Sequence, residues 1–429
     1  MPGKPKPMSL IGLKTADSRS ANGRSTDGRS EAAWKKAMAE DRIEDPKAFA
    51  AFMLGKTSRT FALNIQVLPI GLRRQILLAY LFCRMADTLE DDNELPEGEK
   101  IGLLQMFRGL FPPGPDSQAR LDAFRATVPA VWGASDRWDR LLVHHCHRIL
   151  PQLSDFPQAV VAAISACVDE MCLGMIDFTR KQADARDGRM LIESVEDLDR
   201  YCYYVAGTVG NMLCALFSLH SPLIGKRRAE ELRGLSVSFG LGLQLTNILK
   251  DVQEDRARNV SFIPLSLLQE EHLTESSFLS PDAPSAAAAR LMAGLIGKAK
   301  SHLEDAMDYS CLLPRMEPRL RLFCLWPLFM AAETLVLLAD NLHAEELRAD
   351  DFRAGNRRGV RAETQLKKIS RAQVKNIVGR TSVACWSNFW LRSMFRRAMS
   401  RLDAALARAK AIPQPPTERA SGAVSGANP

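Results

Sequence analysis

The spacing of apolar residues restricts this chain to helical folds. From Pro46 onward these residues recur at intervals of three and four, whereas alternating strand patterns are scarce. One such run is Ile76, Leu77, Tyr80 and Leu81. Helix-breaking clusters rich in Pro, Gly or Ser interrupt the pattern at 112–115, 154–157, 221–222 and 281–284. We therefore predict an all-α fold with one large helical domain over 46–345.

The segments on either side of this domain differ in composition. Residues 1–45 are rich in Lys, Arg, Ser and Gly, which is typical of a flexible leader. We predict a basic amphipathic helical extension over 346–412 and a disordered Pro-rich tail over 413–429. From Phe352 to the end the chain has 16 Lys and Arg and 3 Asp and Glu, a net charge of +13. Because the whole chain carries +7, residues 1–351 carry −6. An acidic body disfavours nucleic acid as a ligand.

Cysteine usage and hydropathy indicate a cytoplasmic protein. The nine cysteines follow no framework spacing and stand mostly among apolar residues, so we expect reduced, buried thiols. The first apolar stretch, 8–13, is too short for a secretory signal. The longest apolar run, 322–339, contains Pro327 and Glu333, which favours a buried core helix over a membrane span. We expect the protein to act as a monomer.

A short acidic pattern occurs twice in the chain. The first and second acidic triads are Asp87, Glu90, Asp91 and Asp251, Glu254, Asp255. Positions i, i+3 and i+4 share one face of a helix, so each triad projects its carboxylates to one side. Each triad also follows an apolar approach that should be buried, and burying like charges is costly unless a cation compensates.

Hard cations that prefer oxygen ligands suit this pattern. Mg²⁺ is often held by one or two carboxylates, with water and phosphate oxygens completing its octahedral shell. Two facing triads would hold Mg²⁺ between them and leave coordination positions for a diphosphate. The ions would stabilise the charge that develops when the carbon–oxygen bond of the diphosphate ionises. The alternative for either triad alone is a solvated helix face.

Polar and basic residues near the triads fit the binding of a diphosphate. They are Ser58, Arg59 and Arg84 ahead of the first triad, and Lys250, Arg256 and Arg258 around the second. Arginine can grip phosphate oxygens in a bidentate manner, and lysine offers a point charge. The alternative is salt bridging between these residues and the carboxylates of the triads.

Four ordered stretches around these residues resemble the squalene and phytoene synthase family, and more closely its squalene synthase branch. They are SRTFALNIQVLP (58–69), YLFCRMADTLEDD (80–92), YCYYVAGTVGNMLCALF (201–217) and LQLTNILKDVQED (243–255). The resemblance covers roughly residues 46–345. It implies an all-α isoprenoid synthase fold with a central active-site cavity.

The resemblance also implies roles for individual residues. The Mg²⁺ ligands it implies are Asp87, Glu90, Asp91, Asp251 and Asp255, with Glu254 and Asp92 in support. Arg59 and Arg84 would bind diphosphate, and Tyr204 would act in the first step as a base or as a cation stabiliser, because an aromatic face stabilises positive charge without adding to it. Other positions that would line the pocket are Tyr80, Gln244, Asn247 and Phe323.

The implied reaction joins two farnesyl diphosphates head to head. One ionises, the double bond of the second captures its allylic cation, and proton loss leaves presqualene diphosphate. A second ionisation, ended by hydride from NADPH, would produce squalene. Such cations must be kept from water, and apolar residues that could form a dry wall, or equally pack in the core, are Leu81, Phe82, Met85, Met212, Leu213, Leu216 and Phe323.

The second step has less support in the sequence. There is no Rossmann fingerprint for NADPH, so this cofactor rests on resemblance. Lys367, Lys368 and Arg371 are similar to a basic cofactor-binding segment of the family, although a solvated charge run explains them equally well. After Phe323 the sequence departs from squalene synthases, which leaves presqualene diphosphate, hydroxysqualene, dehydrosqualene or a phytoene-like compound as alternative products. A chain-elongating prenyl synthase, a terpene cyclase and a non-catalytic membrane-associated helical scaffold are the competing functions.

Aromatic and basic residues interleave over 381–410. Trp386, Phe389 and Trp390 are followed by arginines from Arg392 to Arg401, a pattern suited to an anionic membrane interface. We predict that this segment docks peripherally on the cytoplasmic face of a membrane. The alternative is a helix that packs against the catalytic domain with its arginines in solvent.

Overall fold

The computed structural model describes residues 31–39, 42–184, 190–256, 260–278, 286–353 and 369–410. Almost all ordered elements within these ranges are helices, which confirms the predicted all-α fold. The helices up to the middle of the chain are α1 (Glu31–Ala39), α2 (Pro46–Thr57), α3 (Arg59–Val67), α4 (Ile70–Asp91), α5 (Glu97–Arg108), α6 (Ser117–Thr127), α7 (Trp138–His144), α8 (Gln158–Asp184) and α9 (Val195–Cys202). The later ones are α10 (Thr208–His220), α11 (Lys226–Arg256), α12 (Leu265–Glu270), α13 (Glu275–Phe278), α14 (Ala286–Leu312), α15 (Pro318–Arg353), α16 (Arg371–Ala384) and α17 (Asn388–Lys410).

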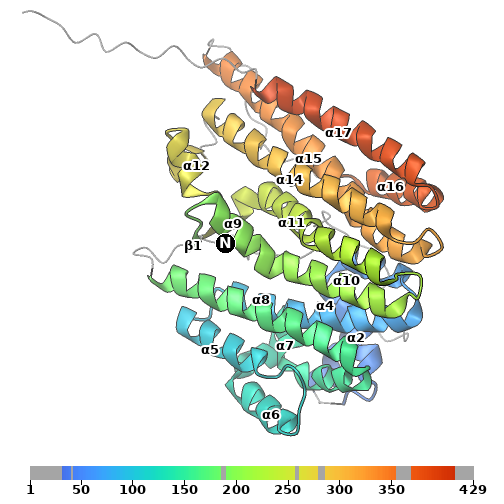
Figure 1. Ribbon diagram of the computed structural model, residues 1–429. Coiled ribbons are helices and arrows are strands. Elements are labelled where there is room, and N and C mark those ends of the chain that lie inside the picture. Colours follow the sequence, from blue (N-terminus) through green and yellow to red (C-terminus); the bar gives the residue numbers. More distant parts are fainter. Residues whose placement is uncertain are drawn as a thin grey trace, which may run out of the picture.

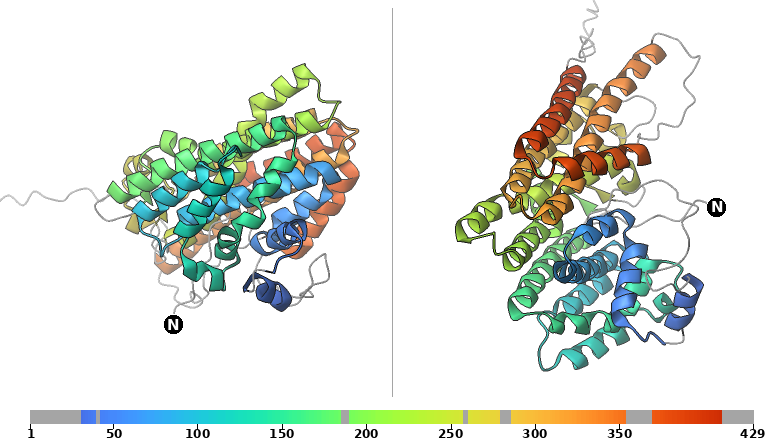
Figure 2. Two further views of the ribbon diagram at one scale, coloured as in Figure 1. Left: turned by 90° about the horizontal axis from the view of Figure 1, so that it is seen from below. Right: turned by 90° about the vertical axis from the view of Figure 1, so that its right-hand side faces the viewer.

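The long helices lie side by side with α4, α10 and α11 in the middle (Figure 1). Helices α14, α15 and α17 cover one side of this group, while α5 and α8 cover the other (Figures 1 and 2). Helix α10 packs against α4, α8 and α11, and α11 packs against α14. The core therefore runs through the whole array, and α10 contacts both helices that carry an acidic triad.

Glycines allow α10 and α11 to approach closely. A Cβ atom at Gly210 of α10 would lie 2.0 Å from the carbonyl oxygen of Ser236 of α11, and one at Gly240 of α11 would lie 2.2 Å from that of Ala206, in the turn just before α10. Real Cβ atoms do not tolerate such distances, so any larger residue would push the two backbones apart. The close crossing holds the second triad's helix against the centre of the fold.

A short strand pair ties two connections together. Strand β1 (Met190–Leu191) pairs in parallel with β2 (Val260–Ser261), with Met190 opposite Val260. The backbone continues this contact, because Leu265 N–H donates to the carbonyl of Ile192 at 2.9 Å. The pair thus links the segment after α8 to the segment after α11. Helix α11 carries the second acidic triad near its C-terminal end.

The leader prediction is wrong for residues 31–39, which form α1. The side chain of Trp34 is fully buried, and its ring stacks on Phe52 of α2 with centroids 4.8 Å apart. A large aromatic residue that buries its whole surface outweighs the polar composition around it. The next helix, α2, begins at Pro46 as expected, and Asp45 caps it by accepting a hydrogen bond from Lys47 N–H at 2.8 Å.

The described parts of the predicted extension, 346–353 and 369–410, are mostly helical, and α17 packs on the body. Helix α15 runs without a break across the expected boundary at 345, and α17 then folds back along α14 and α15. Its buried face includes Leu391, Phe395 and Leu402. The residues of the predicted Pro-rich tail, 413–429, lie outside the described part of the chain.

Three segments are long and apolar enough to cross a membrane by length and composition alone. They are Gln158–Ala183, Val195–His220 and Pro318–Leu342. The most apolar window of Pro318–Leu342 is 83% buried against other helices, as predicted for the run 322–339. All nine cysteines are free and buried, as predicted from their apolar neighbours.

Candidate active site

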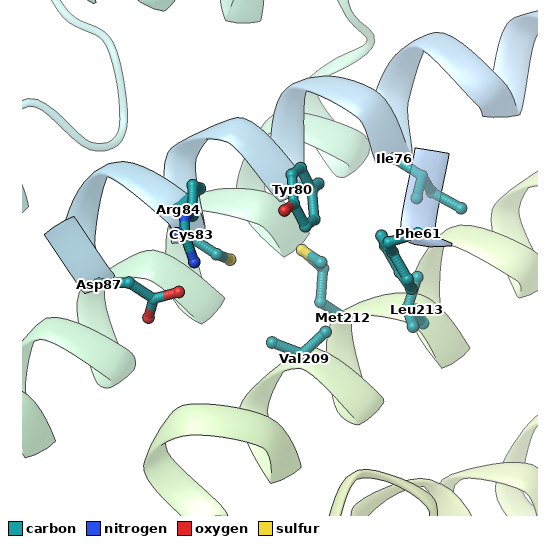
Figure 3. A pocket seen from close by; sticks show the side chains of 9 residues that line it. All are labelled: Phe61, Ile76, Tyr80, Cys83, Arg84, Asp87, Val209, Met212 and Leu213. Atoms are coloured by element: carbon teal, nitrogen blue, oxygen red, sulfur yellow. The ribbon is translucent and has the colours of Figure 1, made fainter. Parts of the chain in front are cut away.

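One face of α4 forms the wall of a narrow pocket, which measures about 340 Å³ when the space open to solvent is included (Figure 3). Five α4 residues line it at the spacing of a single helix face; they are Ile76, Tyr80, Cys83, Arg84 and Asp87. The opposite wall consists of Val209, Met212 and Leu213 of α10, and α3 contributes Phe61. Figure 3 shows the carboxylate of Asp87 and the guanidinium of Arg84 at one end, with Ile76, Phe61 and Leu213 at the other. The pocket is therefore charged at one end and apolar at the other.

Only part of the predicted dry wall lines this pocket. Met212 and Leu213 do so, together with Val209 and Cys83, which the sequence argument did not include. The remaining candidates are buried in the surrounding core; they are Leu81, Phe82, Met85, Leu216 and Phe323. Of these, Phe323 contacts the lining residue Phe61. The α4 candidates fail because they lie on the faces of the helix that turn away from the pocket.

Aromatic rings close the apolar end. Phe61 stacks on Tyr80 with centroids 5.2 Å apart, and its edge meets Phe323 of α15 at 5.5 Å. Tyr80 donates a hydrogen bond to the carbonyl of Thr57 at 3.4 Å. Burial raises the pKa of the Tyr80 phenol, which keeps it protonated. Tyr80 thus presents an uncharged aromatic face to the pocket.

The first acidic triad occupies the last turns of α4. Asp87 is buried, while Glu90 and Asp91 are half-buried. Burial raises the pKa of Tyr201 in α9 well above its ordinary value, and the charges of Glu90, Asp91 and Asp87 raise it further. Tyr201 therefore lies within the electrostatic field of the triad and stays a neutral phenol.

Asp92, expected to support the triad, instead joins a buried ion-pair network. Its oxygens accept hydrogen bonds from Arg140 at 2.7 and 2.8 Å and from Arg137 at 3.3 Å. Asp92 is fully buried and Arg140 is almost so. Pairing with Asp92 raises the pKa of the Arg140 guanidinium, so the guanidinium stays charged. Asp92 thus fixes the end of α4 to the start of α7.

The same network reaches the pocket through Asp139. Arg137 donates to Asp139 at 2.8 and 3.2 Å, and the guanidinium of Arg84 lies 4.0 Å from Asp139. Burial alone would raise the pKa of Asp139, but Arg137 and Arg84 lower it below its ordinary value. Asp139 therefore stays ionised beside Arg84. Sequence reasoning missed these residues, although the alternation Arg137, Trp138, Asp139, Arg140 beside an apolar run is a usable signal.

The second acidic triad lies at the end of α11. Asp251 and Asp255 are buried, whereas Glu254 is exposed. Lys250 Nζ lies 3.1 Å from Asp251 Oδ2 and donates to Asn247 Oδ1 at 3.4 Å. The other oxygen of Asp251, Oδ1, is buried and has no hydrogen-bond partner among the described residues. An ionised oxygen in that condition is costly to bury without a ligand.

Gln244 extends this face of α11 toward the middle of the fold. It precedes Asn247 and Asp251 by one and two helical turns, so the three side chains share a face. Its side chain is buried, and Oε1 has no hydrogen-bond partner within the described part of the chain. Two acceptor oxygens of α11, one of Gln244 and one of Asp251, are thus available to a ligand.

Tyr204 lies in a π-helical turn, η4 (Tyr203–Gly207), between α9 and α10. Such turns often occur at functional sites. Neighbouring Tyr203 donates a hydrogen bond to Glu170 of α8 at 2.7 Å, and the two tyrosine rings meet edge to face at 5.6 Å. Tyr204 is half-buried against α8 and is not among the residues that line the pocket of Figure 3.

The remaining predicted residues fall into two groups. Ser58 is the N-cap of α3, where its hydroxyl accepts from Phe61 N–H at 3.1 Å, and Arg371 is exposed at the start of α16. The others lie outside the described residues, or their side chains do; they are Arg59, Arg256, Arg258, Lys367 and Lys368. Across the described ranges, no three His, Cys, Asp or Glu side chains already form a group that could hold a metal ion.

Known proteins are similar to this chain over most of its helical array. The squalene/phytoene synthase family model matches residues 54–354. Squalene synthase from Solanum lycopersicum is 30% identical over 303 residues, which are 68% of this chain and 65% of the relative. Squalene synthase from Schizosaccharomyces pombe is 30% identical over 292 residues, which are 67% of this chain and 59% of the relative. The chain thus spans less than two thirds of the length of either relative.

A solved structure shares the fold. TcSQS in complex with the ligand E5700 aligns with a TM-score of 0.63 at 21% identity and covers 86% of this chain and 98% of its own. The helical array agrees with the match of the family model over residues 54–354. The chain belongs to the squalene/phytoene synthase family.

Proposed function

We propose that this protein joins two prenyl diphosphates, with farnesyl diphosphate as substrate, head to head. The observation that carries the proposal is the pocket of Figure 3, which pairs Asp87 and Arg84 at one end with an apolar, aromatic-lined end. A prenyl diphosphate has the same division, because its head is a dianion or trianion and its tail is a hydrocarbon. Membership of the squalene/phytoene synthase family supports the same substrate class.

The donor set of the two triads fits Mg²⁺. All the side chains involved offer oxygen, which is the ligand that Mg²⁺ prefers, and Asp251 Oδ1 is a buried carboxylate oxygen with no hydrogen-bond partner among the described residues. Asp87, Glu90 and Asp91 on α4 and Asp251, Glu254 and Asp255 on α11 would hold the ions. When bound, Mg²⁺ neutralises charge on the departing diphosphate.

The chain's own residues would bind the diphosphate and shield the cation. Arg84, held charged beside Asp139 and Asp87, binds phosphate oxygens, and Lys250 adds a positive charge at the second triad. In the first step the carbon–oxygen bond of one substrate breaks and its diphosphate leaves. The double bond of the second substrate then forms the new carbon–carbon bonds as a proton is lost. The neutral ring of Tyr80 in the pocket, and Tyr204 in the π-helical turn, are the aromatic groups proposed to stabilise the positive charge.

The second step of the proposal is reductive. NADPH would supply the hydride that ends a second ionisation, with squalene as product, and Lys367, Lys368 and Arg371 are the residues proposed to bind its phosphate. The apolar lining that Val209, Met212 and Leu213 provide supports this step as well, since it excludes water from a cation. Water quenching would divert the product to hydroxysqualene.

One incubation tests both steps. The purified chain is mixed with farnesyl diphosphate and Mg²⁺, with and without NADPH, and extracted products are identified by mass spectrometry. We expect presqualene diphosphate without NADPH and squalene with it. Presqualene diphosphate or an alcohol under both conditions would retain the first step and refute the reductive one. If no condensation product forms with any prenyl chain length, and Mg²⁺ does not promote binding of a diphosphate analogue, the non-catalytic scaffold replaces this proposal.

A further inference from the structure

Large apolar side chains gather in solvent at the turn between α16 and α17. Val383, Trp386, Phe389 and Trp390 are 67%, 52%, 71% and 55% exposed, respectively, within eight consecutive residues. Figure 2 shows that the two helices diverge from this turn. Contiguous exposed apolar surface of this kind marks an interaction site more often than scattered single residues do.

Two adjoining grooves lie beside these side chains. One, of about 860 Å³, is lined by Val383 and Trp390, and the other, of about 1010 Å³, reaches Phe329 and Ile377. Both are lined by the same three residues, Arg380 of α16 and Met394 and Arg397 of α17. Each groove thus combines an apolar surface with Arg380 and Arg397, and the larger groove is also lined by Glu333 and Arg401, which pair with each other at 2.9 Å. We call residues 380–397 the α16–α17 corner.

Five of the arginines on α16 and α17 divide into two groups. Arg392, Arg401 and Arg408 pair with Asp308, Glu333 and Asp340 of the body at 2.6, 2.9 and 2.8 Å. Among the described residues, no carboxylate pairs with Arg380 or Arg397, which face the grooves. The first group holds α17 on the body, while Arg380 and Arg397 remain available for an anionic ligand.

Helix α15 contacts both the corner and the apolar end of the pocket. Phe323 of α15 contacts Phe61 in the pocket wall, and Trp326, nearly one turn later, packs in a cluster with Ile369 and Ile377 beside the grooves. One helix therefore contacts both places.

We propose that the α16–α17 corner docks on an anionic lipid surface. Trp386, Phe389 and Trp390 enter the interface, where tryptophan rings are favoured, and Arg380 and Arg397 bind a lipid phosphate in the grooves. The proposed docking surface is smaller than the segment 381–410 predicted from the sequence. The apolar face of α17 is already packed on α14 and α15, so it cannot lie on a membrane. The proposed function explains why docking is useful, but the binding itself does not depend on catalysis.

Flotation of the full chain with vesicles tests the proposal without an activity assay. One set of vesicles is neutral phosphatidylcholine, and the other is phosphatidylcholine mixed with anionic phosphatidylglycerol. Two double variants of the corner are compared with the parent chain. The first carries Arg380→Gln and Arg397→Gln, and the second carries Trp386→Ser and Trp390→Ser. Each double variant has a control elsewhere on the surface. Arg180→Gln together with Arg227→Gln removes the same charge, and Val131→Ser together with Leu173→Ser removes exposed apolar side chains. Circular dichroism melting verifies that every variant folds.

We expect binding to anionic vesicles that falls about 20-fold in the arginine variant, given the contribution of each basic residue near a charged membrane. The tryptophan variant should also bind less and lose fluorescence quenching by brominated lipids, while both controls bind like the parent chain. Equal binding by corner and control variants would overturn the proposal. So would displacement from the vesicles by millimolar glycerol phosphate, since the grooves would then bind free phosphate rather than a membrane.

Discussion

A Cβ atom at position 174 would lie 2.1 Å from Cγ of Tyr204, so only glycine at this point of α8 admits the tyrosine ring. The π-helical turn that carries Tyr204 is also held by Thr208, whose hydroxyl donates to the Tyr204 carbonyl at 2.7 Å. Both contacts fix where the ring lies. The position of the residue proposed to act in the first step therefore depends on a glycine in another helix.

Gly174→Ala should displace Tyr204. Overpacking of this kind costs about 1–3 kcal/mol, and we expect a lower melting temperature together with slower formation of the first-step product. The control is Gly55→Ala in α2, where nothing lies within 4 Å of the added Cβ; this change should leave activity intact and stabilise the helix slightly. A Gly174→Ala protein that melts and turns over like the parent would show that the ring does not need its present position.

Asp251→Asn should remove Mg²⁺-dependent binding without unfolding the protein. The substitution removes a negative charge beside a buried carboxylate oxygen with no hydrogen-bond partner among the described residues. It keeps an amide oxygen beside Lys250 Nζ, 3.1 Å from Asp251 Oδ2, but takes the charge from that buried pair, so a melting curve verifies that the variant folds. Turnover should fall by about 10²-fold or more, the scale of losing one group that stabilises developing charge. Isothermal titration with a non-ionising diphosphate analogue, with and without Mg²⁺, measures the binding. The Asp87→Asn variant should show the same loss of Mg²⁺-dependent binding and of turnover. Unchanged Mg²⁺ dependence in both variants would refute the two-triad metal site.

Asp92→Ala should act on stability instead of on metal binding. It leaves the buried guanidinium of Arg140 without the carboxylate that accepts its two hydrogen bonds, at 2.7 and 2.8 Å. Breaking a buried pair by removing one partner costs about 3–5 kcal/mol. Because Glu94 still pairs with Arg140 at 2.9 Å, we expect a loss toward the lower end of that range, which urea unfolding would detect. The exposed pair of Arg227 and Glu231 offers the control, since Arg227→Gln should change the free energy of unfolding very little. Equal stability of the two variants would contradict the structural role of Asp92.

His302 should make stability depend on pH near neutrality. Burial lowers the pKa of its imidazole, Lys298 lowers it further, and Asp199 and Asp305 oppose the change. The unfolded chain therefore binds this proton at a higher pH than the folded chain. The contribution to stability is complete above the unfolded value of about 6.5 and is lost as the pH falls below it.

The test is urea unfolding of His302→Gln at pH 7 and pH 5. The loss of stability between these two pH values should be smaller in this variant than in the parent chain, because the group that gains a proton on unfolding is gone. His220→Gln changes an exposed histidine and serves as the comparison. An identical pH dependence in parent and His302→Gln would show that another group dominates this range.

Local helix geometry explains what could be predicted of the site. Tyr80, Arg84 and Asp87 line the pocket together because the helical repeat alone puts them on one side of α4. The same repeat assigns Gln244, Asn247 and Asp251 to one face of α11. Leu81 and Phe82 were equally apolar candidates for the wall, but their hydrophobicity does not reveal which buried face meets a pocket and which meets another helix.

The all-α class, the two acidic triads and their helix faces could be predicted from the sequence, because they depend on hydrogen bonds and spacings within a few residues. The tertiary structure decided the partners of Asp92, since Arg140 is 48 residues away and only folding brings the two charges together. It also decided that Gly174 makes room for Tyr204, and that α17 buries its apolar face on the body while the tryptophans of the turn remain in solvent. Those outcomes depend on which surfaces pack together, and local pattern does not encode that choice.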